Sequence, residues 1–237
     1  MKRSVRILCL VLALVMCASM LTGCKKTDPD PALPENTAPV FDPAAYVKGG
    51  LDAVYLGQYS DEYLAMLGST EDKCAASYEN GMQVSMQVFA AYFGIELDGC
   101  SEAVKAELLE LMKSMYAKAN YSVGTVTQTD TGYTVEVSIS PLASVAQAAQ
   151  NDYPAFAKDA ATRLSEGTLD KSSQSFKDWW ARSIASMVSA RVAAPEYFDA
   201  QTVAVTLTKT GEGVYAFAGT SLSDVDALVV PYPTYAS

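Results

Sequence analysis

Two segments with strand periodicity, each interrupted by a glycine-containing turn, are the feature that most restricts the fold of this chain. Residues 121–129 and 133–140 flank a DTG turn, and residues 202–209 and 214–220 flank a TGEG turn. Apolar and polar residues alternate along these segments, which predicts two β-hairpins, and Pro141 ends the first of them. Each hairpin has one apolar face, and that face has to be buried against another layer of structure.

Helical periodicity occupies the sequence before and between the hairpins. Apolar residues three or four apart, with start and stop signals, predict helices between Asp42 and Gly57, Ser60 and Gly68, Ser69 and Gly94, after Ser101, over a region kinked near Pro154, around Phe176–Val188 and at 222–228. Strand–helix–strand alternation is absent, so a parallel sheet is disfavoured. We therefore predict a single α+β domain over residues 41–237, with helices packed on an antiparallel sheet of about four strands made of the two hairpins.

The N-terminal segment has the pattern of an export signal. Lys2, Arg3 and Arg6 precede an apolar stretch from Ile7 to Leu21, which is too short for a comfortable membrane-spanning helix. The stretch ends in the tetrapeptide LTGC at 21–24. This tetrapeptide resembles the lipobox of bacterial lipoproteins. The resemblance implies that residues 1–23 are a signal peptide cleaved between Gly23 and Cys24, and that Cys24 is lipidated with a diacylglyceryl group.

Residues 24–40 are expected to form a tether between the lipid and the folded domain. The stretch KKTDPDPALPENTAPV that follows Cys24 is polar and contains four prolines, so it favours an extended polyproline II conformation. At about 3.1 Å per residue, it could hold the domain as far as about 50 Å from a bilayer. The sequence thus predicts a protein on the extracytoplasmic face of the cell membrane, anchored in the lipid bilayer through Cys24.

Composition excludes several kinds of chemistry. The chain contains no His, so neither a Ser-His-Asp nor a Cys-His catalytic group can form, and the imidazole ligand of most zinc sites is missing. Glycine-rich phosphate-binding motifs are absent too, and we predict no cofactor, no metal and no catalytic residue. Loss of residues 1–23 would change the net charge from −10 to about −13, because three basic residues leave and no acidic ones. Such an acidic body makes nucleic acid a poor partner.

The candidate binding residues are aromatic. Trp179 and Trp180 are adjacent on a predicted helix, so their side chains point about 100° apart and only Trp180 fits the buried stripe. Trp179, with Tyr197 and Phe198, could form a stacking surface for a sugar or a partner chain; the alternative is that Trp179 packs at the boundary of the core. Asp224 and Asp226 lack the remaining features of a Ca²⁺ loop, and we expect them at a solvated helix start.

The two cysteines of the body, Cys74 and Cys100, are expected to remain separate thiols. Cys74 lies near the start of the long helix predicted to end at Gly94, so that the helix carries the chain about 28 Å away from Cys74. A disulfide bond needs Cα atoms within about 7 Å, and the few residues before Cys100 could return that far only if fully extended.

In outline the body resembles the uncharacterised lipoproteins of Gram-positive bacteria that are grouped as domains of unknown function. The residues that carry this resemblance are DPAAYVKGGLDAVYLGQYSDEY at 42–63 and YSVGTVTQTDTGYTVEVSIS at 121–140. Such families have no established catalytic motif, so the resemblance assigns no role to numbered positions. Two functions stay open: a non-catalytic module that binds an envelope protein, peptide or glycan, or a cell-envelope hydrolase that uses Asp/Glu carboxylates with or without a metal.

Overall fold

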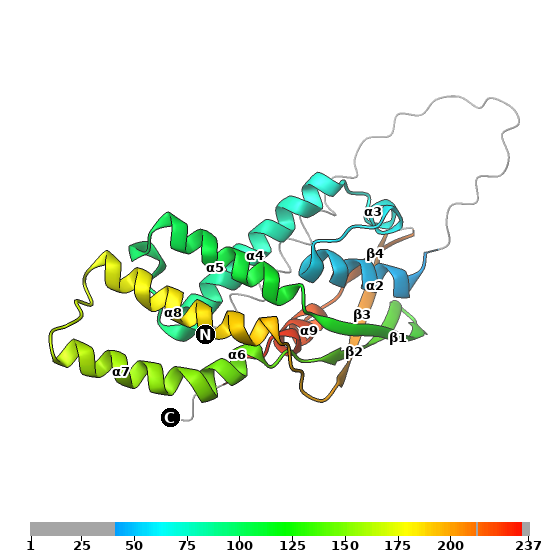
Figure 1. Cartoon of the computed structure of the whole chain (residues 1–237). Coiled ribbons are helices and arrows are strands. Elements are labelled where there is room, and N and C mark those ends of the chain that lie inside the picture. Colours follow the sequence, from blue (N-terminus) through cyan, green and yellow to red (C-terminus); the bar gives the residue numbers. More distant parts are fainter. Residues whose placement is uncertain (1–40, 212, 234–237) are drawn as a thin grey trace, which may run out of the picture.

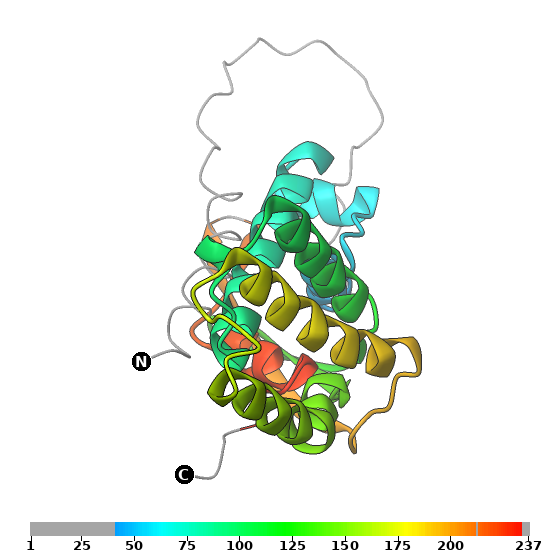
Figure 2. The same cartoon turned by 60° about the vertical axis from the view of Figure 1, so that its left-hand side comes forward.

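The structure is a computed structural model, which describes residues 41–211 and 213–233. Helices and strands follow one another in the order predicted (Figures 1 and 2). The α-helices are α2 (Pro43–Leu51), α3 (Asp61–Leu67), α4 (Glu71–Phe93), α5 (Glu102–Tyr116), α6 (Ser144–Gln147), α7 (Tyr153–Ser165), α8 (Gln174–Ala193) and α9 (Ser221–Val229). The strands are β1 (Asn120–Thr129), β2 (Gly132–Ser140), β3 (Gln201–Gly211) and β4 (Val214–Phe217).

The two hairpins join into one antiparallel sheet among the described residues, with strand order β1-β2-β3-β4. The central pairing is between β2 and β3, with Val135 opposite Val205 and Val137 opposite Val203. The predicted α+β fold with a four-stranded sheet is therefore confirmed. Strand β4 ends at Phe217, earlier than the alternation suggested, because the chain turns there into α9.

The two faces of the sheet differ in chemistry. Val135, Val137 and Ile139 of β2 and Val205 and Leu207 of β3 are fully buried on one face, which contacts α2 and α9. The register places hydroxyl side chains of neighbouring strands together on the opposite face, Thr134 with Thr206 and Ser138 with Thr202, and between them Glu136 lies opposite Ala204. One-sided burial of this kind is typical of an antiparallel sheet.

Side-chain caps fix the beginnings of several helices. The Asp42 carboxylate accepts hydrogen bonds from the backbone N–H groups of Ala44 and Ala45, at 2.8 and 3.1 Å, immediately before Pro43. Ser60 and Ser101 cap α3 and α5 in the same manner. The start predicted at Ser69 is off by one residue: α4 begins after Thr70, whose side chain makes no capping hydrogen bond. The predicted interruption near Pro154 is confirmed, since a π-helical turn at Ala148–Asp152 separates α6 from α7.

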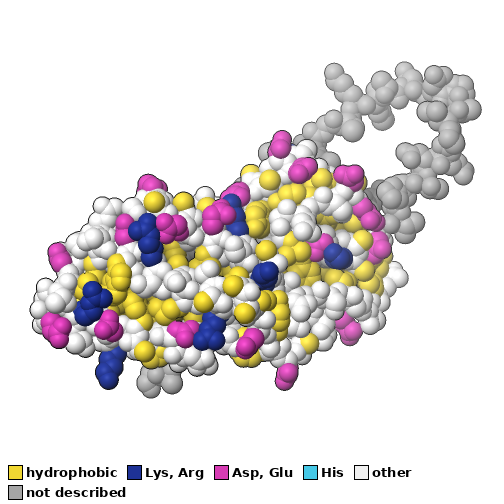
Figure 3. Space-filling view, in the orientation of Figure 1, with side chains coloured by type: hydrophobic (Ala, Val, Ile, Leu, Met, Phe, Trp, Pro, Cys, Tyr) yellow, Lys and Arg dark blue, Asp and Glu magenta, His cyan; other side chains and the backbone are white. Residues whose placement is uncertain are grey.

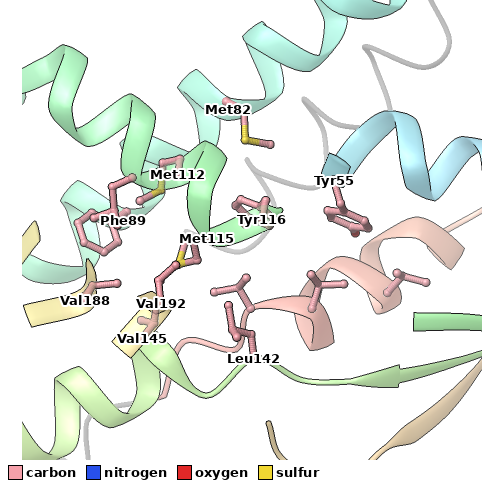
Figure 4. Close-up of a cluster of buried hydrophobic side chains, with 14 of the residues drawn as sticks. Tyr55, Met82, Phe89, Met112, Met115, Tyr116, Leu142, Val145, Val188 and Val192 are labelled. Atoms are coloured by element: carbon pink, nitrogen blue, oxygen red, sulfur yellow. The ribbon is translucent and has the colours of Figure 1, made fainter. Parts of the chain in front are cut away.

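The core lies where α4, α5 and α8 meet α9 and the sheet (Figure 4). Phe89 of α4, Met112 of α5 and Val188 of α8 are among its fully buried side chains. Leu142, in the segment between β2 and α6, is fully buried there too. Cys74 and Cys100 are both buried and no disulfide joins them, which confirms the prediction of two separate thiols. Helix α4 continues through Gly81 without a break.

One position departs clearly from its sequence-based interpretation. Asp224 is exposed as expected, but Asp226 is only 5% exposed, so the expectation of a solvated helix start is wrong for that residue. Val225 and Val229 of α9 pack into the core, and Asp226, three residues before Val229, lies on the flank of the helix next to them. The helical spacing of these neighbours, and not the polarity of the aspartate, determines its burial.

Close packing of α2 against α3 predicts that Gly49 tolerates no side chain. A Cβ atom at Gly49 would lie 2.5 Å from the ring of Tyr63, which is 1% exposed. We expect Gly49→Ala to lower the free energy of unfolding by about 1–3 kcal/mol through overpacking. Gly124→Ala is the matched control, since its nearest new contact would be at 3.6 Å, and it should stay within about 0.5 kcal/mol of wild type. Equal denaturation midpoints for the two variants would contradict this prediction.

Candidate functional site

Helix α8 presents the two tryptophans in different directions. The indole N–H of Trp180 donates a hydrogen bond to the carbonyl oxygen of Phe93 at 3.1 Å, and its ring packs against the core. Trp179 lies on the adjacent flank of the helix, where its ring centroid is 5.2 Å from that of Phe156 and 5.7 Å from that of Phe176. Trp180 packs against the core as predicted, whereas Trp179 is not part of that packing; neither indole is fully buried.

Trp179 takes part in an open groove along the outer flank of α8, with a volume of about 780 Å³. Figures 1 and 2 show α8 between α5 and α7, and Figure 3 shows hydrophobic side chains gathered among charged ones over this region. The groove combines aromatic, hydroxyl and charged groups; its lining residues are Phe156, Ser175, Asp178, Trp179, Arg182, Ser183, Ser186 and Met187. This mixture is suited to a ligand that offers both apolar surface and hydrogen-bonding groups.

Charged side chains hold α8 against α5 beside the groove. The Asp178 carboxylate accepts a hydrogen bond from the backbone N–H of Ser101 at 2.8 Å, and the Arg182 guanidinium donates two hydrogen bonds of 2.9 Å to Glu107. The Ser101 N–H lowers the pKa of Asp178, and the hydrogen bonds from Arg182 lower the pKa of Glu107. Both carboxyl groups are therefore ionised at neutral pH, whereas a general acid needs a raised pKa.

A cation covers part of the candidate stacking residue. The guanidinium carbon of Arg163, at the end of α7, lies 5.1 Å from the ring centroid of Trp179, within the range of a cation–π contact. Together with Phe156 and Phe176, this arginine fixes the orientation of the indole. The Trp179 ring is thus held as part of the groove wall, and it is packed on more than one side.

Tyr197 and Phe198 lie beyond the other end of α8. They are 38% and 46% exposed, and they are held by a hydrogen bond from the Tyr197 hydroxyl to the Lys118 carbonyl and one from the Phe198 N–H to the Pro141 carbonyl, both 2.9 Å. From Trp179 to the end of α8 at Ala193, the helix rises about 21 Å. The structure therefore does not bring Trp179 together with Tyr197 and Phe198 in one stacking surface.

Other elements of the predicted site fall partly outside the described residues. The lipidation site Cys24, the cleavage site between Gly23 and Cys24, and the tether lie in residues 1–40, which the structure does not describe. Within residues 41–211 and 213–233, no helix combines the length and hydropathy needed to cross a bilayer. The same part of the chain contains no group of three or more Cys, Asp and Glu side chains arranged to hold a metal ion.

Comparison with known proteins gives one structural match. No protein-family model matches the chain, and no curated protein matches it in sequence. Among solved structures, the crystal structure of a "putative lipoprotein (ycdA)" from Bacillus subtilis is similar, with a TM-score of 0.54 and 11% sequence identity over 80% of this chain. The match spans 56% of the Bacillus subtilis chain. At this identity the similarity concerns the fold, an α+β arrangement also found in a protein described as a lipoprotein.

The contact between Asp178 and Ser101 predicts a pH-dependent contribution to stability. The folded protein lowers the pKa of Asp178, so its contribution is present above the unfolded value of about 3.9 and is lost as the pH falls through the lower folded value. Asp178→Ala should therefore lower the melting temperature at pH 6, and the difference from wild type should shrink below about pH 3.9. Asp159→Ala, an exposed carboxylate of α7, is the control. A difference for Asp178→Ala that stays constant down to about pH 2 would contradict the assignment.

Proposed function

We propose that this chain is a bacterial lipoprotein, anchored through Cys24 on the extracytoplasmic face of the cell membrane, with a body that acts as a non-catalytic binding module. The observation that carries the proposal is the tetrapeptide LTGC at 21–24, which follows a basic and then an apolar segment of signal-peptide length. The fold similarity to a Bacillus subtilis protein described as a putative lipoprotein supports it.

The position where the tether joins the body supports an orientation for the anchored protein. Phe41, the first described residue, stacks on Tyr215 of β4 with ring centroids 4.2 Å apart, at the sheet end of the molecule. Figure 1 shows that α7 and the start of α8 lie at the opposite end. The tether of residues 24–40 would therefore join the body at the sheet end, and attachment there would leave the α8 groove uncovered.

Substitution of Cys24 tests the anchor. Cys24→Ala removes the thiol that would receive the diacylglyceryl group, so we expect no incorporation of labelled palmitate and a chain that keeps residues 1–23. Cys17→Ala is the matched control, because Cys17 lies within the apolar stretch and before the LTGC tetrapeptide. It should be labelled and cleaved like wild type. Equal labelling of both variants, or a native chain that begins at Met1, would refute the lipoprotein assignment.

The α8 groove supports a peptide or glycan segment as the ligand of the body. Trp179, Phe156 and Met187 offer apolar surface, while Ser183 and Ser186 offer hydroxyl groups that can donate and accept hydrogen bonds. Sugars and extended peptides present this combination of apolar and polar groups. The acidic net charge of −10 argues against nucleic acid. We infer that the groove holds a segment of an envelope peptide or glycan.

Site-specific photo-crosslinking tests the groove in intact cells. A photoreactive phenylalanine analogue at Ser186, an exposed groove position, should give a discrete crosslinked species that Trp179→Ala weakens by about tenfold, in line with the loss of an aromatic anchor worth 1–2 kcal/mol. The same analogue at Lys73, exposed on α4 and outside the groove, is the control. Crosslinking of the same species with equal yield from Ser186 and Lys73, unaffected by Trp179→Ala, would rule out the groove as the binding surface.

A further inference from the structure

A second, more enclosed cavity lies on the other side of Trp180 from the groove. It has a volume of about 320 Å³ and sits between α7, the end of α4 and the beginning of α8. Phe93, Tyr153 and Trp180 form an aromatic wall, with centroids 5.5 Å apart for Phe93 and Tyr153 and 6.2 Å apart for Tyr153 and Trp180. The hydrogen bond from the Trp180 indole to the Phe93 carbonyl fixes this wall.

Small side chains on α7 leave the space open in front of the aromatic wall. Ala157, Ala160 and Ala161 line the cavity together with Leu164, and positions three and four apart share one face of a helix. Larger side chains at these positions would fill the volume against Phe93 and Trp180. The cavity therefore has an apolar interior, of a size at the lower end of the range of small-molecule sites, which begins at about 300 Å³.

The opening of the cavity carries a local excess of positive charge. Lys171, Lys177 and Glu96 all line it, and the Lys177 ammonium is 3.0 Å from a Glu96 carboxylate oxygen. Lys171 is exposed and forms no ion pair with any residue that the structure describes. In a chain of net charge −10, these three residues leave one uncompensated positive charge at the mouth of an apolar cavity.

We propose that this cavity binds a small amphiphilic carboxylate, with an aromatic ring or short acyl chain against Phe93 and Trp180 and the carboxylate near the Lys171 ammonium. One unpaired cation matches a ligand with a single negative charge, while a phosphate monoester would bring close to two. The apolar body would be removed from water by the aromatic wall, which supplies the affinity, and Lys171 would select for the anion. The proposal concerns neither the lipid anchor nor the α8 groove.

Binding of 3-phenylpropionate to the full chain in lipid nanodiscs tests the cavity, with empty nanodiscs as the blank. We expect saturation-transfer NMR signals and a measurable dissociation constant for 3-phenylpropionate, and about two- to fivefold weaker binding of the uncharged 3-phenylpropan-1-ol, which cannot pair with the exposed Lys171 ammonium. Lys171→Glu should weaken 3-phenylpropionate binding by about tenfold and leave the alcohol unchanged. Lys158→Glu, an exposed lysine of α7 that does not line the cavity, is the matched control and should bind like wild type.

Filling the cavity provides an independent test. Ala157→Leu should abolish binding of both compounds. If Ala157→Leu lowers the melting temperature, Ala161→Leu, at an exposed position of the lining, takes its place and should give the same loss of binding. Equal affinity for the acid and the alcohol, with no effect of Lys171→Glu, would overturn the selection for an anion. Absence of binding by either compound up to about 10 mM would overturn the cavity as a ligand site. Both outcomes are read from variants of cavity residues that leave Cys24 unchanged, so they can be told apart from a failure of the anchor test.

Discussion

The pairing of β2 with β3 is the interaction on which the rest of this structure depends. It joins the hairpin of β1 and β2 to the hairpin of β3 and β4, with Gly132 opposite Thr208 at one end and Ile139 opposite Gln201 at the other. Neither hairpin alone can bury its apolar face, but the joined sheet offers a continuous surface that α2 and α9 cover. Helices α5, α7 and α8 extend this core away from the sheet (Figure 1). The candidate groove and cavity on α7 and α8 are thus attached to a core that the sheet, α2 and α9 build together.

Helix α8 connects the sheet to the candidate groove and cavity. Its C-terminal end leads into β3, while its N-terminal half is attached to α5 through Asp178 and Arg182, and to the segment after α4 through Lys177. Because Trp179 and Trp180 are adjacent, about 100° apart around the helix, one dipeptide contributes to the outer groove and to the enclosed cavity. A ligand in the groove would contact Trp179, and a ligand in the cavity would contact Trp180, the next residue along the chain.

Local patterns in the sequence predict the helices, the strands and the class of fold, but they do not predict which residues come together in the candidate sites. Alternation and turn residues located both hairpins, and the helical stripe separated Trp180 from Trp179, because these features depend on neighbours within a few residues. The burial of Asp226 and the distance of Tyr197 and Phe198 from Trp179 depend on which elements pack together, which periodicity does not specify. The cavity could not be predicted from the sequence either. Ala157, Ala160 and Ala161 are ordinary helix formers, and they line a cavity only because α7 lies opposite Phe93 and Trp180.

Charge distribution adds a constraint on how such a protein can recognise a ligand. The body is strongly acidic, so an anion that approaches it from a distance is repelled, and Debye screening limits this repulsion to about 8–10 Å at physiological salt. Within that range the nearest charges determine whether an anion is attracted. At the mouth of the cavity their sum is positive, because Glu96 neutralises Lys177 but not Lys171. The apolar interior is therefore needed as well as the cation: a bare anion gains little at an exposed lysine, whereas an amphiphile adds the burial of its apolar part. Acidic surroundings and a single cation at an apolar cavity together favour ligands that are mainly hydrophobic and carry one charge.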